Sequence, residues 1–216
     1  PAATLVVAGW EPAPPAGARG DGAAIEAAAV SLAAPGETVC GDACAFALDG
    51  ALASAMVVDG LGHGVDAAAA AQAALAVFAQ QPFAAPGALI GATHEALRST
   101  RGAAVTVVQA DAQQGLIRSA GVGNILGRLV SGTADRTLMG QHGTAGLAIR
   151  RPEETSTPWP PHALLVLCTD GIESRWKPQL LAPVLARDPA IAAALLMREA
   201  CRGRDDATVA VLRRTP

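Results

Sequence analysis

The sequence predicts an α+β fold, a four-layer α/β/β/α sandwich of two antiparallel sheets flanked by helix pairs. Its apolar runs follow the order strands, two helices, several strands, two helices and a last strand. Helices clustered in this way argue against a parallel, doubly wound sheet. Hydrophobic residues make up 51% of the 216, enough for one full core. We therefore expect a single domain at 24–216, after an irregular lead-in at 1–23.

Three strands and two helices are expected in the first half, with strands at 24–33, 42–48 and 52–58. Asp49-Gly50 lies between the second and third strands, and Asp-Gly between apolar runs is typical of a two-residue hairpin turn. An Ala-rich helix is expected at 65–80. It ends before Pro82 and Pro86 because proline lacks the N–H that a helix interior needs. A second helix is expected at 88–99.

The second half of the sequence predicts a meander of short antiparallel strands at 103–110, 116–120 and 125–130, separated by small turn residues. The Gly- and Pro-rich segment 131–161 is expected to be an irregular loop, and such long loops are usually functional or mobile. A continuous apolar strand follows at 163–168. Helices are expected at 178–186 and 189–201, the second begun by Asp188-Pro189, before a last strand at 207–212.

Composition excludes several classes of function. The net charge of −3 gives no basic surface for nucleic acid or an anionic membrane. The longest apolar stretch, 65–79, is interrupted by Asp66 and Gln72 and is too short to span a bilayer. No signal segment opens the chain. The cysteines lack C-x-x-C spacing and are expected to be buried free thiols in a reducing cytosol, with a zinc site as the alternative. We therefore expect a cytoplasmic protein.

Four aspartates lie at the boundaries of apolar strands: Asp42, Asp59, Asp170 and Asp205. Asp42 opens and Asp59 closes the strands of one hairpin, so their side chains can converge. A carboxylate at such a boundary is costly unless it is paired, hydrogen-bonded or bound to metal. The alternative is an ordinary turn, as at Asp49-Gly50, to which we assign no catalytic role. Four such acids favour a site for hard cations such as magnesium or manganese.

Two such cations can perform hydrolysis without an activated serine or cysteine. A water bridging metals about 4 Å apart has its pKa lowered from about 16 toward 7, which makes hydroxide available at neutral pH. The same ions give a phosphoryl group two Lewis-acid contacts. The acids therefore point to phosphate ester hydrolysis by a metal-activated water.

Six motifs in a fixed order carry a family resemblance. They are C-G-D (40–42), D-G-L-G-H-G (59–64), R-G-A-A-V-T (101–106), G-V-G-N (121–124), T-D-G-I (169–172) and R-D-D-A-T-V (204–209). Together they resemble the metal-dependent protein phosphatase (PPM) family, in particular its small bacterial RsbX/SpoIIE-like branch, over roughly residues 25–213. The resemblance implies an α/β/β/α sandwich that removes phosphate from serine or threonine with two manganese or magnesium ions.

The resemblance also implies a ligand set for the two metals. Asp59 would bridge them and the carbonyl of Gly60 would complete one coordination sphere. The remaining carboxylates would come from Asp42, Asp170 and Asp205. Of the pair Asp205-Asp206, the family pattern favours the first as ligand and leaves the second to order the turn.

Other positions depart from the family pattern or carry weaker signals. Asn124 stands where many relatives have an aspartate associated with a third metal, so no strong third site is expected. His63 is a candidate general acid for a leaving serine oxygen, with an exposed turn residue as the alternative. Arg101 and Arg175 are candidate phosphate-binding groups, with ordinary surface arginines as the alternative.

We expect a serine/threonine phosphatase whose substrate is a phosphorylated bacterial regulatory protein, of the STAS-domain stressosome or anti-sigma-antagonist type. The alternative is a catalytically weak phosphoprotein-binding module of the same fold. An ATP-binding anti-sigma kinase is rejected, because such kinases need an asparagine-bearing helix and the segment before Asp59 is strand-like without asparagine. No nucleic acid or membrane partner is expected.

Overall fold

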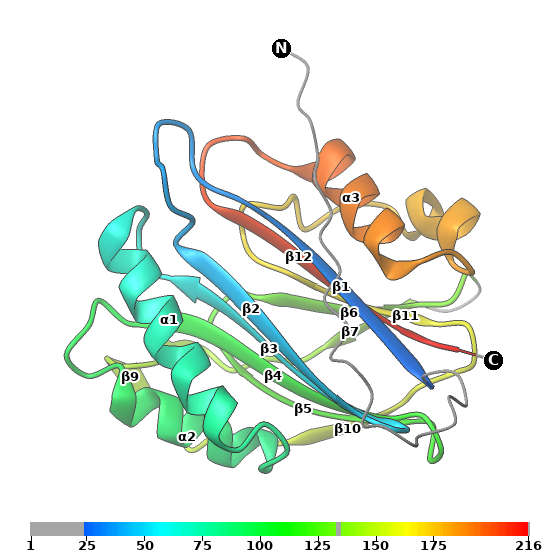
Figure 1. Ribbon diagram of the computed structural model, residues 1–216, viewed down its shortest axis with the longest axis horizontal. Coiled ribbons are helices and arrows are strands. Elements are labelled where there is room, and N and C mark those ends of the chain that lie inside the picture. Colours follow the sequence, from blue (N-terminus) through cyan, green and yellow to red (C-terminus); the bar gives the residue numbers. More distant parts are fainter. Residues whose placement is uncertain (1–23, 133–134, 216) are drawn as a thin grey trace, which may run out of the picture.

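Two antiparallel sheets pack face to face, and helices cover the outer face of each (Figure 1). The computed structural model describes residues 24–132 and 135–215, so the expected lead-in at 1–23 lies outside the described residues. The arrangement confirms the four-layer sandwich that the order of apolar runs predicts. No helix of the described residues is long and apolar enough to cross a membrane.

The first sheet carries the Asp49-Gly50 hairpin. Its strands, in spatial order, are β10 (Thr155–Pro158), β5 (Leu116–Val122), β4 (Ala103–Asp111), β3 (Leu52–Gly60) and β2 (Asp42–Asp49). The two-residue loop of this hairpin is Gly50-Ala51, one residue later than the expected Asp49-Gly50, because Asp49 pairs with Leu52. Gly50 takes the first loop position with a φ of 57°, a left-handed conformation that glycine adopts without strain. The outer face is covered by α1 (Val65–Gln80) and α2 (Pro86–Ala96). Alanines form most of the buried face of α1, which lets the helix approach the sheet closely.

The second sheet has β11 near its centre. Its strands, in spatial order, are β1 (Ile25–Leu32), β12 (Ala207–Arg214), β11 (Leu164–Cys168), β6 (Leu126–Val130) and β7 (Asp135–Leu138). Its outer face is covered by a 3-10 helix, η1 (Pro178–Val184), and by α3 (Pro189–Ala200). All of β11 is buried, because Leu165 and Leu167 face the other sheet while Leu164 and Val166 pack beneath the helices. Burial on both faces explains its continuous apolar run.

Segment 131–161 differs most from expectation. It contains β7, β8 (Gly143–Thr144), β9 (Ala148–Ile149) and β10, of which β7 and β10 form edges of the two sheets. These strands are short and mostly polar, so they show no apolar alternation. β7 pairs with the preceding strand β6 and β8 pairs with β9, whereas β10 pairs with β5, which is distant in sequence. Helix α2 begins at Pro86, earlier than expected, because proline suits the first helical position. The segment at 178 is a 3-10 helix with Pro183 inside it, where an α-helical hydrogen bond cannot form.

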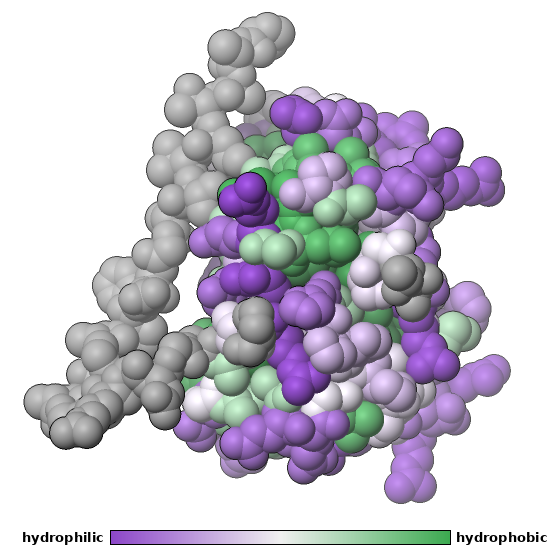
Figure 2. Space-filling view, turned by 90° about the vertical axis from the view of Figure 1, so that its right-hand side faces the viewer, coloured by the Kyte–Doolittle hydropathy of each residue, from purple (hydrophilic) through white to green (hydrophobic). Residues whose placement is uncertain are grey.

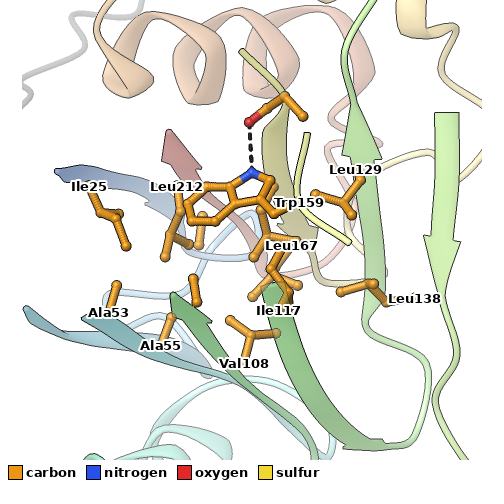
Figure 3. Close-up of a cluster of buried hydrophobic side chains, with 14 of the residues drawn as sticks. Ile25, Ala53, Ala55, Val108, Ile117, Leu129, Leu138, Trp159, Leu167 and Leu212 are labelled. Atoms are coloured by element: carbon orange, nitrogen blue, oxygen red, sulfur yellow. Dashed lines mark hydrogen bonds between the residues drawn. The ribbon is translucent and has the colours of Figure 1, made fainter. Parts of the chain in front are cut away.

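The core between the sheets consists mainly of Ala, Val, Leu and Ile side chains around one large ring (Figure 3). Trp159 is fully buried there, and its indole Nε1 donates a hydrogen bond to the carbonyl of Ala163 at 2.9 Å. The four cysteines are free, as expected. Cys168 is buried, but the other three are only partly buried, so the expectation of burial is wrong for them.

One end of the sandwich shows hydrophobic residues surrounded by hydrophilic ones (Figure 2). A cavity of about 320 Å3 lies at the end where β6 finishes and β11 begins, lined among others by Leu129, Pro158 and Ala163. The four aspartates lie at the opposite ends of the strands. The cavity is therefore separate from the candidate site.

Arg128 links β6 to Asp135 of β7 and to Trp176, which follows β11. Its side chain is paired with Asp135, donates to the carbonyl of Trp176 at 2.8 Å and stacks over the Trp176 ring at 4.0 Å. We expect Arg128→Ala to lower the free energy of unfolding by about 1–2 kcal/mol, because a nearly buried cation and its stacking contact are lost while the more exposed Asp135 is rehydrated. Urea unfolding checks this. Arg198→Ala, which removes an exposed ion pair, should change stability little.

Candidate active site

The four aspartates converge at one end of the sandwich. Asp42 and Asp59 are direct register partners at the open end of the β2–β3 hairpin. Asp170 follows β11 and Asp205 precedes β12, and these two strands are antiparallel neighbours. One pair therefore comes from each sheet. The expected meeting of the strand ends is what the structure shows.

Burial and mutual repulsion destabilise the charged form of Asp42, Asp59 and Asp170, whose pKa values are raised. Burial, then the charges of Asp42, Asp170 and Asp205, raises the pKa of Asp59 to about 8. Burial likewise raises the pKa of Asp42 to about 7, against hydrogen bonds from Thr169 and Thr208 that favour its charged form. The pKa of the more exposed Asp170 is raised by partial desolvation and by the charge of Asp205. Such a cluster is stabilised by positive charge.

Glycines in the motifs allow the acid-bearing turns to pack against one another. A Cβ at Gly60 would overlap the carbonyl oxygen of Ala67, and one at Gly171 would overlap the carbonyl oxygen of Asp206. A Cβ at Gly41 would lie 2.5 Å from Asp206 Oδ2. Close approach, rather than an unusual backbone angle, is thus the reason for glycine beside Asp42, Asp59 and Asp170.

The two neighbouring acids before β12 have different environments. Asp206 is only 3% exposed, and its Oδ1 accepts a hydrogen bond from the backbone N–H of Ala34 at 2.8 Å. Asp205 is exposed, and its Oδ1 accepts a hydrogen bond from the N–H of Asp206 at 2.9 Å. This is the division of roles expected for the pair, with Asp206 anchoring the turn. Asp205 as the ligand stays a prediction.

Two neutral side chains donate hydrogen bonds to the acids. The buried Thr169 hydroxyl donates to Asp42 Oδ2 at 2.6 Å, and the amide of Asn124 donates to Asp170 Oδ2 at 2.7 Å. The sequence singled out Asn124 only as a departure from the family pattern, and it assigned Thr169 no role. The available signal was a hydroxyl residue directly before the acid at a strand end.

His63 lies on the exposed side of the turn after Asp59. Its side chain is 61% exposed, and its Nδ1 is 2.5 Å from Glu37 Oε1. This placement agrees with the exposed-turn alternative and leaves Nε2 as the ring nitrogen available for proton transfer. Glu37, which lies over the same turn, was not found from the sequence, because its connection to His63 exists only in the fold.

Arginines flank the acids on two sides. Arg101 is ion-paired with Asp66 at 2.6 Å and approaches Gly62 in the turn after Asp59. Arg202, which the sequence did not single out, lies on the other side, where its charge opposes the rise in the pKa of Asp170. The backbone N–H of Arg175 donates to Glu173 Oε1 at 3.3 Å. Arg101, beside the turn after Asp59, and Arg202, whose charge acts on Asp170, are the better-placed candidates for a phosphate contact.

The candidate ligand atoms of this site are of the kind that hard divalent cations prefer. It offers four carboxylates, and every candidate ligand atom, including the Gly60 carbonyl, is oxygen. In the described part of the chain, however, no group of three or more His, Cys, Asp or Glu side chains is arranged closely enough to hold a metal ion. Convergence of the four backbone positions is thus observed, whereas coordination by their oxygens stays a prediction.

Comparison with known structures gives the same fold. A chain from a structure described as "The bacterial stressosome: a modular system that has been adapted to control secondary messenger signaling" is 29% identical, with a TM-score of 0.79 over 88% of this chain and 99% of that one. RsbX, crystallised in complex with magnesium, is 20% identical, with a TM-score of 0.78 over 88% and 96%. The PP2C phosphatase domain of SpoIIE from Bacillus subtilis, solved with a fragment of its regulatory domain, is 21% identical, with a TM-score of 0.75 over 88% and 63%.

A comparison with curated proteins found no match. The sequence model of the family described as "Stage II sporulation protein E (SpoIIE)" matches residues 49–215, more than half of the chain. This match confirms the resemblance inferred from the six motifs. The chain belongs to the SpoIIE family, and it has the fold of the PP2C phosphatase domain of SpoIIE.

Proposed function

We propose that this protein hydrolyses phosphoserine or phosphothreonine on a bacterial regulatory protein, with two manganese or magnesium ions held by its four-aspartate centre. This centre comprises Asp42, Asp59, Asp170 and Asp205. The observation that carries the proposal is the convergence of these acids from both sheets at one end of the sandwich. The burial of Asp42 and Asp59 and the charges of the neighbouring aspartates call for positive charge at this place.

The residues have distinct roles in this proposal. Asp59 and the Gly60 carbonyl would hold the cations from the first sheet together with Asp42, and Asp170 and Asp205 would hold them from the second. When bound, the cations supply Lewis-acid stabilisation of the phosphoryl oxygens and a water of lowered pKa. Arg101 and Arg202 would orient the phosphate from either side.

A protein substrate of the STAS-domain stressosome or anti-sigma-antagonist type is the proposed partner. The support is the likeness, at 29% identity over almost the full length of both chains, to a chain from a bacterial stressosome structure. Membership of the SpoIIE family is consistent with a role in bacterial regulation.

Manganese-dependent turnover tests the proposed activity. We expect hydrolysis of a generic aryl phosphate and release of phosphate from a serine-phosphorylated STAS-domain protein, both abolished by EDTA and restored by Mn2+. Colorimetric phosphate release and phosphate-affinity gels measure the two reactions. Asp49→Asn is a suitable control, because Asp49 is an exposed aspartate at the far end of the same hairpin and should leave turnover unchanged. Robust turnover in EDTA would contradict the proposal.

The phosphoprotein-binding module is a second candidate that one observation favours. The absence, among described residues, of a preformed three-ligand group fits a protein that recognises a phosphorylated partner without hydrolysing it. Calorimetry with Mn2+ separates the two candidates. Stoichiometric binding of two ions favours the phosphatase, whereas no binding, together with retained affinity for the phosphorylated partner, favours the module.

A further inference from the structure

Thr169 uses all of its polar groups at the junction between the two sheets. It directly follows β11 in the second sheet and is 1% exposed. Its hydroxyl reaches across to Asp42 Oδ2 of β2, in the first sheet, at a distance of 2.6 Å. This bond links the sheets where the four aspartates converge.

The direction of the hydroxyl proton follows from the neighbouring bonds. The backbone N–H of Thr208 donates to Thr169 Oγ1 at 2.8 Å, so one lone pair of the hydroxyl is occupied. The proton must therefore point to another acceptor. Asp42 Oδ2 at 2.6 Å is closer than the carbonyl of Thr208 at 3.5 Å. The hydroxyl of Thr169 therefore donates to Asp42 Oδ2.

The same residue starts the turn that carries Asp170. The carbonyl of Thr169 accepts a hydrogen bond from the N–H of Ile172 at 3.1 Å, which closes the Thr169–Ile172 turn. In a regular ladder that carbonyl would face the N–H of Thr208, but the hydroxyl takes its place. The side chain thus extends the β11–β12 pairing by one residue while freeing the backbone to turn. Asp42 and the Asp170 turn are joined through a single residue.

We propose that Thr169 is a positioning residue whose hydroxyl holds the Asp42 carboxylate in place relative to the Asp170 turn and so sets the affinity of the four-aspartate centre for divalent cations. The inference rests on the proposed function and adds to it a residue that does not contact the cation. Partners that orient metal ligands typically change metal affinity by about 10–100-fold when removed. Thr169 has the burial and bond geometry of such a partner.

Two substitutions separate the hydroxyl from the shape of the side chain. Thr169→Val keeps the shape and removes the hydroxyl, whereas Thr169→Ser keeps the hydroxyl and removes a methyl group. We expect Thr169→Val to raise the Kd for Mn2+, measured by calorimetry on chelator-treated protein, by about 10-fold or more. Thr169→Ser should bind Mn2+ like the unaltered protein. The increase in Tm on adding Mn2+ should shrink in Thr169→Val alone.

A destabilised control guards against a purely structural effect. Val166→Ala leaves a cavity on the buried face of β11 beneath the helices, so it should lower the Tm without changing the Kd for Mn2+. The inference is overturned if Thr169→Val binds with an unchanged Kd, if Thr169→Ser is as weak as Thr169→Val, or if Val166→Ala weakens binding equally. An unaltered protein that binds no Mn2+ contradicts the proposed function and, with it, the inference.

Discussion

Asp59→Asn is expected to abolish phosphatase activity and, in EDTA, to unfold at a higher temperature than the unaltered protein. The carboxylate of Asp59 lies among the charges of Asp42, Asp170 and Asp205, and its pKa is raised to about 8. An acid with a raised pKa loses folding free energy when it ionises, so this cost begins above its unfolded pKa of about 4 and grows until about pH 8. The amide has the same shape and no charge.

Both the loss of activity and the gain in thermal stability should be measurable in Asp59→Asn. Activity should fall at least about 100-fold, since even groups that only orient metal ligands typically account for about 10–100-fold. A gain of about 1 kcal/mol in the free energy of unfolding would raise Tm by about 2–4 °C in a domain of this size. Phosphate release and thermal unfolding at pH 7.5 (and again at about pH 4, where the gain should disappear) measure both effects.

Asp49→Asn is the matched control for this change. It replaces an exposed aspartate at the other end of the hairpin, away from the other acids. Neither activity nor stability should change appreciably. A metal-free Asp59→Asn protein that is less stable than the unaltered one would show that favourable contacts hold Asp59, so that its charge would not call for a cation at this place.

Gly171→Ala is expected to lower both stability and activity, for a steric reason. A Cβ at this position would overlap the carbonyl oxygen of Asp206 and would lie 2.8 and 2.9 Å from Cβ and Cα of Ala207. These atoms of Asp206 and Ala207 belong to the backbone or are attached directly to it, and they cannot rotate away. The turn that carries Asp170 must therefore move away from β12. We expect a loss of about 3 kcal/mol, typical of an overpacked core, and a fall in Tm of about 6–12 °C.

Activity and metal affinity should fall in Gly171→Ala as well, because the displaced turn carries Asp170. Gly91→Ala is the control. Gly91 lies in α2 with no atom within 4 Å of a new Cβ, and alanine is the better helix former by about 1 kcal/mol. This control should be unchanged or slightly more stable. A Gly171→Ala protein with unaltered Tm and Mn2+ affinity would mean that the turn is not packed on β12 as described.

The turn between the strands of Asp42 and Asp59 could be predicted because nearby residues mark it, but its register could not. A two-residue loop at Asp49-Gly50 would place Asp42 opposite Val57, whereas the observed loop is Gly50-Ala51 and places Asp42 opposite Asp59. Strand β11 was also predictable, since five consecutive apolar residues indicate burial on both faces. Edge strands β7 and β10 were not, because each has only four mostly polar residues and shows no apolar alternation, and β10 pairs with a strand distant in sequence.

The side chains around the acids depend on the fold in the same way. Glu37 meets His63, and Thr169 meets Asp42, through contacts between segments far apart in sequence. No local pattern marks such a pair, because each partner alone is an ordinary polar residue.

The order of the layers and the position of each aspartate at a strand end could be predicted from the sequence, because apolar periodicity and turn chemistry are local properties, and the family followed from the resemblance of six ordered motifs. The three-dimensional fold was needed to show which neutral donors reach the acids, which of Asp205 and Asp206 is buried, and where the arginines lie. Those features depend on how two sheets, joined by long connections, bring their ends together. That meeting is a matter of packing between distant segments, which a pattern along one chain does not encode.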